Sequence, residues 1–197
     1  MTRPFSPASE RNKQPIFRVV DTLLPEGARV LEIGAGTGQH AEFFTLKRPD
    51  LDWLATDVGA RIADLEGVAH ATGSPPRFRV EPLELGQDDW PDGPFDAVFT
   101  ANTLHIMPWP NTARLIEGAS RLLSPAGLLI CYGPFKAQGR HNADSNIEFD
   151  QSLRARDPLM GIRDLVELRR LGEQFALPVR SEISLPANNR LIVFGKC

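Results

Sequence analysis

Three closely spaced glycines, Gly34, Gly36 and Gly38, form the part of the sequence best suited to hold a ligand. They follow the apolar run 28–33 and precede a helical pattern. A strand that breaks into glycines and continues as a helix is a usual place for an α/β sheet to bind a nucleotide-like cofactor. The third glycine of the dinucleotide fingerprint is missing, because Gln39 stands there. A tight structural turn without a ligand is the alternative interpretation.

Acidic residues near this loop complete a pattern that resembles motif I of the class I S-adenosylmethionine (SAM) methyltransferases. Glu32 lies two residues before the first glycine, where a carboxylate can help to place the ammonium group of an amino-acid tail. Asp57 ends the next predicted strand and suits ribose hydroxyls, or it caps the following helix. The resemblance implies that Glu84 accepts from the adenine amino group and that the N–H of Leu85 donates to the ring. An acid at 88–89 could replace Glu84.

The end of the predicted fourth strand carries a second set of polar side chains, within residues 101–109. The methyl group of bound SAM would point there, so we expect Asn102 to hold the cofactor or the substrate. His105 is the first candidate for a base, because an unperturbed imidazole titrates near neutral pH. A histidine that only packs or stabilises a turn is the alternative. Tyr132 is a weaker candidate base, and Trp109 either walls the pocket or belongs to the core.

The polar segment 136–157 is too long to be an idle connection in a compact domain, so we predict a substrate-side insertion. Together with Phe135, its mixture of charges suits a small polar substrate, although a solvated loop could have the same composition. Asn146 and Asp150 are its candidate substrate-binding residues.

The elements that must position these residues alternate between strand and helix. The predicted strands are 28–33, 52–57, 78–85, 95–101 and 127–132, followed by a helix over 161–177. Two last runs, 179–185 and 190–194, predict an antiparallel hairpin. Residues 1–14 form an expected arm or lid before a helix that begins near Pro15. We therefore expect an α/β fold, a single Rossmann-like class I methyltransferase domain over 1–197.

Composition argues against several other classes of protein. A net charge of −3 over 197 residues gives no broad phosphate-binding surface, so no nucleic-acid partner is expected. Cys131 and Cys197 are too few for a disulfide framework or a zinc site, and no metal is expected. No apolar run reaches membrane-spanning length and no signal peptide is recognisable, so we expect a cytoplasmic protein without a membrane partner. The oligomeric state stays open.

Seven short motifs in a fixed order resemble one family of methyltransferase-like proteins. They lie at 9–13, 36–40, 102–109, 132–135, 145–150, 161–164 and 186–189. The chain resembles, from about residue 9 onward, the methyltransferase-like domain-of-unknown-function family that includes methyltransferase-like protein twenty-six. The resemblance implies a SAM-binding class I fold. It also implies that residues 10–13, with Asn12 and Lys13 among them, belong to the site as part of a lid, and that Asn188 and Asn189 belong to its rim.

The leading hypothesis is a SAM-dependent methyltransferase that transfers the methyl group in line to a small polar molecule and releases S-adenosylhomocysteine (SAH). An NAD(P)-dependent oxidoreductase is a second hypothesis, disfavoured by Gln39 and by the terminal hairpin. A non-catalytic SAM-binding module is a third, and the polar residues at 102–105 and 136–150 argue against it. Neither the acceptor molecule nor its reacting atom is indicated by the sequence.

Overall fold

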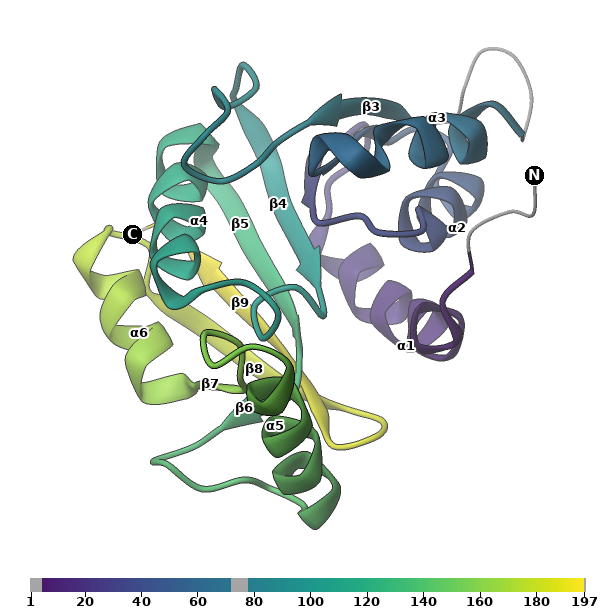
Figure 1. Ribbon diagram of the computed structural model, residues 1–197. Coiled ribbons are helices and arrows are strands. Elements are labelled where there is room, and N and C mark those ends of the chain that lie inside the picture. The colour runs from purple at the N-terminus through teal and green to yellow at the C-terminus, as the bar shows by residue number, and fades with distance from the viewer. Residues whose placement is uncertain (1–4, 72–77, 197) are drawn as a thin grey trace.

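A seven-stranded sheet forms the centre of the computed structural model, which describes residues 5–71 and 78–196 (Figure 1). The strand order is β3-β2-β1-β4-β5-β9-β8. The strands are β1 Arg29–Ile33, β2 Asp52–Asp57, β3 Arg79–Pro82, β4 Phe95–Ala101, β5 Leu123–Gly133, β8 Val179–Leu185 and β9 Asn189–Gly195. Strands β1 to β5 are parallel, whereas β9 is antiparallel to both β5 and β8. The predicted α/β class with a mostly parallel sheet and a C-terminal hairpin is confirmed.

Helices cover both faces of this sheet. They are α1 Pro7–Leu23, α2 Gln39–Lys47, α3 Ile62–Ala71, α4 Trp109–Leu122, α5 Asp144–Arg156 and α6 Leu165–Gln174, with a 3-10 turn η1 at Gly59–Arg61. One apolar core joins α1, α2 and α3 to the sheet, and the other joins α4 and α6 to its opposite face. Neighbouring residues of β4 enter different cores, because Val98 belongs to one and Phe99 to the other. Burial on both faces explains why β4 is apolar except at Asp96 and Thr100.

Helix α1 begins earlier than the sequence pattern predicts. Residues 7–14 are helical rather than a loose arm, and residues 1–4 of the predicted lid lie outside the described part. The Ser6 hydroxyl accepts a hydrogen bond from the backbone N–H of Ser9 at 3.2 Å, and Pro7 occupies the first turn. Pro15 lies inside the helix, where burial of Ile16 on the sheet helps to offset its missing backbone hydrogen bond.

The segment 136–157 contains helix α5, which has a polar inner face. Its buried residues are Asn146, Asp150 and Leu153, at helical spacing. Because two of these three positions are polar, the apolar periodicity that reveals other helices is weak here. The predicted helix 161–177 is shorter in the structure, since Asp164 caps α6 by accepting from the N–H of Val166 at 2.9 Å.

Two other predicted strands differ in length from the observed ones. The strand predicted at 78–85 is limited to β3, and the one predicted at 127–132 starts earlier, at Leu123. Short parallel strands β6 (Phe135–Lys136) and β7 (Arg163–Asp164) pair outside the main sheet. Within the described ranges, no helix combines the length and apolar character needed to cross a bilayer.

The strand order reverses between β1 and β4, which lie side by side at the centre of the sheet. In open parallel sheets, the crevice beyond the carboxyl ends of such strands is the usual ligand site. The loops after β1, β2, β4 and β5 therefore converge at one edge of the molecule.

A buried acid lies just before this edge. Glu32 is 1% exposed, and its Oε2 accepts a hydrogen bond from the indole N–H of Trp53 at 2.9 Å. Its Oε1 lies 4.0 Å from Nδ1 of His40. Burial raises the pKa of Glu32 to about 8, with a further contribution from Asp57, and burial lowers the pKa of His40 to about 4. Both side chains are therefore neutral near pH 7.

This burial predicts a pH-dependent stability that Glu32→Gln removes. The pKa of Glu32 is raised in the folded chain, so its stabilising contribution is complete below the ordinary pKa of 4.5 and is lost as pH rises through about 8. Between the ordinary pKa of 4.5 and the raised pKa of about 8, the free energy of unfolding falls by up to about 1.4 kcal/mol per pH unit. Urea unfolding of the parent protein and of Glu32→Gln is measured from about pH 5 to about pH 9. The free energy of unfolding should decline less with rising pH in the variant than in the parent. Glu66→Gln, at an exposed acid on α3, should keep the parent's decline; equal profiles for parent and Glu32→Gln would contradict the prediction.

Candidate functional site

The three glycines of the loop after β1 have left-handed backbone conformations, and Gly34 packs tightly against Thr103. Gly34 has a φ of +73°, and a Cβ there would lie 2.6 Å from Cγ2 of Thr103. The backbone N–H of Gly34 donates to the carbonyl of Thr56 at 2.9 Å. The N–H of Gly36 donates to Oδ2 of Asp57 at 2.7 Å. These bonds tie the loop to the end of β2.

A cavity of about 580 Å³ opens beside this loop, and we call it the cofactor cavity. The predicted cofactor residues that line it are Gly34, Gly36, Asp57, Glu84, Leu85 and Asn102. Oδ1 of Asp57 accepts from the N–H of Val58 at 2.8 Å, so the carboxylate is fixed at the mouth of the loop. Gln87 donates to Oε1 of Glu84 at 2.6 Å. The ends of β1, β2 and β4 and the loop after β3 thus meet around one space.

Two predicted cofactor residues do not line this cavity. Glu32 lies behind the loop, held by Trp53 as described above. Gly38 begins α2 and packs against α3, where a Cβ would lie 3.2 Å from Leu65 and 3.3 Å from Val68. Both residues support the shape of the loop from outside the cavity.

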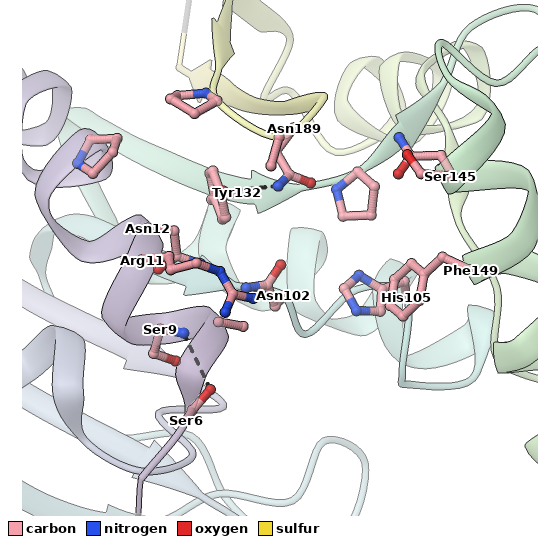
Figure 2. Close-up of a pocket in the computed structure, with 16 residues that line it drawn as sticks. Ser6, Ser9, Arg11, Asn12, Asn102, His105, Tyr132, Ser145, Phe149 and Asn189 are labelled. Carbon is pink, nitrogen blue, oxygen red and sulfur yellow. Dashed lines mark hydrogen bonds between the residues drawn. The ribbon is translucent and has the colours of Figure 1, made fainter.

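A second cavity of about 540 Å³ adjoins the first, and we call it the acceptor cavity (Figure 2). The predicted residues that line it are Arg11, Asn12, Asn102, His105, Tyr132, Asn146 and Asn189. Figure 2 shows side chains of α1 on one side and of α5 on the other, with Asn189 of the β8–β9 hairpin between them. Helices α1 and α5 therefore build opposite walls, and the hairpin lies between them.

Asn102 lies at the junction of the two cavities. It lines both, together with Ser6 and Ser9 at the start of α1. Its φ is +59°, a left-handed conformation that costs about 1 kcal/mol or more in a residue other than glycine. The backbone N–H of Asn102 donates to the carbonyl of Tyr132 at 2.8 Å and so helps to hold this turn. Strain of this kind, held by the surrounding fold, is frequent at functional sites.

His105 is buried at the wall of the acceptor cavity, with 6% of its surface exposed. Its ring meets the ring of Phe149 edge-on at 5.2 Å between centroids. Burial lowers the pKa of His105 to about 4, with smaller contributions from the positive charges of Arg163 and Arg156. The imidazole is therefore neutral at pH 7 and can accept a hydrogen bond or a proton.

Tyr132 ends a chain of interacting polar side chains that starts beside the cofactor cavity. Nε2 of His40 lies 2.7 Å from Oδ1 of Asn12, and since this oxygen only accepts, the imidazole donates. The side chain of Asn12 also acts on Tyr132 and lowers the pKa of its hydroxyl. Nδ2 of Asn189 also donates to the Tyr132 hydroxyl, at 3.0 Å. Burial raises the pKa of Tyr132, which makes it a poor base at neutral pH.

Five predicted substrate residues do not line the acceptor cavity. Lys13 pairs with Glu10 at 2.6 Å. Trp109 and Phe135 pack in or against the core beneath α4 and α6. Asp150 accepts from the N–H of Ile162 at 2.7 Å and lies within ion-pair distance of three basic side chains.

Asn188 is the last of these five. Its carbonyl accepts from the side chains of Asn142 at 2.9 Å and Asn146 at 3.3 Å, so it joins the hairpin to the segment that leads into α5. Its neighbour Asn189 is the residue that lines the cavity. A local sequence pattern could not show which of the predicted substrate residues line the cavity, because each position depends on a partner far away in the sequence.

Several lining residues had no assigned role in the sequence analysis. Ser6 and Thr103 are two of them, and His40 and Phe149 are two more. The Ser6-Pro7 pair is a helix-start signal that could have revealed Ser6. His40 and Phe149 fall within two of the motifs that carry the family resemblance, at 36–40 and 145–150. Thr103 depends on contacts between elements, for which the sequence offers no comparable signal.

Solved structures with the same fold are methyltransferases by description. CalO1, a methyltransferase in calicheamicin biosynthesis solved with SAH bound, matches with a TM-score of 0.80 and 17% identity over 96% of this chain and 54% of its own. An O-methyltransferase family 2 protein of Planctomyces limnophilus, solved with apigenin, matches with a TM-score of 0.80 and 19% identity over 96% of this chain and 60% of its own. A putative O-methyltransferase of Nostoc punctiforme matches with a TM-score of 0.83 and 18% identity over 95% of this chain and 56% of its own.

These comparisons establish the fold, and the chain spans little more than half the length of each of the three proteins. Their shared architecture is the Rossmann-like α/β fold of methyltransferases. A family model matches almost the entire chain, over residues 3–196, and its description is "Protein of unknown function (DUF938)". The chain therefore belongs to the DUF938 family.

Proposed function

We propose that this protein is a SAM-dependent methyltransferase that acts on a small polar molecule. The observation that carries the proposal is the meeting of two cavities at Asn102, one lined by the glycine loop and the other by His105 and Tyr132. Two adjoining spaces of this size fit a cofactor and a separate acceptor. The likeness to methyltransferase structures supports the same function. Kinship with methyltransferase-like protein twenty-six stays a prediction.

The residues of the cofactor cavity fit SAM. Gly36 lines the cavity, and a Cβ there would meet no other atom within 4 Å, so the glycine leaves open space in which a ligand can approach the backbone closely. Asp57 offers carboxylate oxygens for ribose hydroxyls, and Glu84 offers acceptors for an adenine amino group. When bound, SAM supplies a methyl group on a cationic sulfur.

Residues of this chain would then orient the acceptor and receive its proton. Asn102 borders both cavities, so its amide can align the acceptor with the cofactor. His105 is neutral and buried, so its imidazole can accept a hydrogen bond from the reacting group and take the proton that this group releases. Phe149 covers the imidazole from one side and limits its access to water.

Asp57→Ala should weaken SAH binding about tenfold to a hundredfold, because hydrogen bonds to a charged group contribute about 1.5–3 kcal/mol. Isothermal titration calorimetry with SAH measures this change directly. Asp64→Ala is the matched control, since Asp64 is exposed on α3 and lines neither cavity. Folding of each variant is checked by circular dichroism.

NADH separates this proposal from an oxidoreductase. We expect saturable binding of SAH and none of NADH to the same protein. Binding of NADH without SAH, or of neither ligand to well-folded protein, would refute the proposed function.

His105→Ala should lower kcat at least about a hundredfold while SAH affinity is kept, because general-base catalysis contributes about 10²–10⁴-fold. Because the pKa of His105 is lowered to about 4, its protonation should not reduce the rate between pH 8 and pH 6. The acceptor for this assay is found by incubating a metabolite extract with methyl-labelled SAM and identifying the labelled product by mass spectrometry. The exposed His70 of α3 provides the control variant His70→Ala. An unchanged kcat, or a His105-dependent loss of rate centred near pH 6.5, would count against this role.

A further inference from the structure

The acceptor cavity carries a single formal charge among its described lining residues. Arg11 is the cation, and no aspartate or glutamate of the described chain lines this space. The cofactor cavity differs, because Asp57 and Glu84 line it together with Arg61. Acids and Arg11 are thus segregated between two adjoining cavities. This distribution disfavours a cationic amine in the acceptor cavity and favours an anion.

The positive charge of Arg11 is not neutralised by the protein. Within the described part of the chain, its guanidinium forms no ion pair, although Lys13 on the same helix is paired with Glu10 at 2.6 Å. Figure 2 shows the Arg11 side chain extending from α1 toward Asn102 at the junction of the two cavities. A guanidinium presents a planar fork of donors that matches carboxylate and phosphate oxygens.

The Tyr132 hydroxyl provides a second donor. It accepts a hydrogen bond from Nδ2 of Asn189 at 3.0 Å. A phenol that accepts a hydrogen bond retains its own hydrogen as a donor. Burial raises the pKa of Tyr132 and keeps this hydrogen in place at neutral pH.

Two helix N-termini also border the cavity. Ser6 and Ser9 belong to the start of α1, and Ser145 and Asn146 belong to the first turn of α5. The N-cap residue of α5 is Ala143, whose side chain accepts no hydrogen bond from the helix. The positive ends of both helix dipoles therefore add to the charge of Arg11. His105, nine-tenths buried and lining the same space, is neutral and adds no competing charge.

We propose that the methyl acceptor is an anionic small molecule whose carboxylate or phosphate group is held by the guanidinium of Arg11 and the hydroxyl of Tyr132. The inference rests on the proposed methyltransferase function and names its substrate class. Arg11 is a specificity-determining residue in this assignment, and the role of His105 toward the reacting group is separate.

The test compares four small phenols on SAH-loaded protein by calorimetry. The probes are 4-hydroxybenzoate, its neutral amide 4-hydroxybenzamide, and the cation 4-hydroxybenzylamine; 4-hydroxyphenyl phosphate replaces the carboxylate by phosphate. We expect an anion to bind at least about tenfold more tightly than the amide or the amine. The tighter of the two anions identifies the preferred group.

Variants assign the preference to particular residues. Arg11→Ala should abolish the preference for the anion, and Tyr132→Phe should reduce it severalfold, with SAH affinity unchanged within about twofold. Arg18→Ala is the matched control, because Arg18 is an exposed residue of the same helix that lines neither cavity. The labelled product from a metabolite extract should likewise be retained on an anion exchanger, and its yield should fall with Arg11→Ala.

Opposite results overturn the substrate class. They are preference for the amine, equal or absent binding of all probes, or a labelled product that only a cation exchanger retains. A tenfold loss of SAH affinity in Arg11→Ala, with the anion preference kept, would assign Arg11 to the cofactor carboxylate instead. Failure of SAH to bind the parent protein is a different result, which refutes the proposed function itself.

Discussion

The hydrogen bond between the N–H of Gly36 and the carboxylate of Asp57, at 2.7 Å, is the contact on which both cavities depend. It joins the loop after β1 to the end of β2 and keeps the loop in its left-handed conformation. The loop in turn sets where α2 begins, and α2 carries Gln39 near its start. Oε1 of Gln39 accepts from the N–H of Ser6 at 2.6 Å, which fixes the first turn of α1. The acceptor cavity is thus built outward from the cofactor cavity.

Much of the sheet and most of the cofactor cavity could be predicted from the sequence. Strand β4 is buried on both faces and is therefore apolar except at Asp96 and Thr100, and the glycine loop needs backbone angles that few other residues adopt. Asp57 and Asn102 stand directly at strand ends, where parallel topology brings side chains together. At these positions, the residue type that the fold requires is also the one that a local sequence pattern reveals.

The acceptor cavity could be predicted only in part, because its walls are made by contacts between distant segments. Helix α5 turns Asn146 and Asp150 inward, yet Asn146 reaches the cavity and Asp150 is used to hold the N–H of Ile162. Phe135 is apolar and enters the core, as burial of apolar surface favours. Identical residue types at 188 and 189 end in different environments, because Asn188 lies in the turn with a φ of +58° whereas Asn189 is the first residue of β9. No short motif encodes which of two neighbours faces the space.

The acceptor cavity has one wall from α1 and another from the turn before β9, which are nearly the full length of the described chain apart. Closing so long a loop costs more chain entropy than joining neighbouring strands, and contacts of this kind form late in folding. A partly folded chain can therefore assemble β1, β2 and β4 around the glycine loop before the hairpin docks against β5. In kinetic terms, the pocket for the cofactor matures first, and the pocket that selects the methyl acceptor is the last part of the site to take shape.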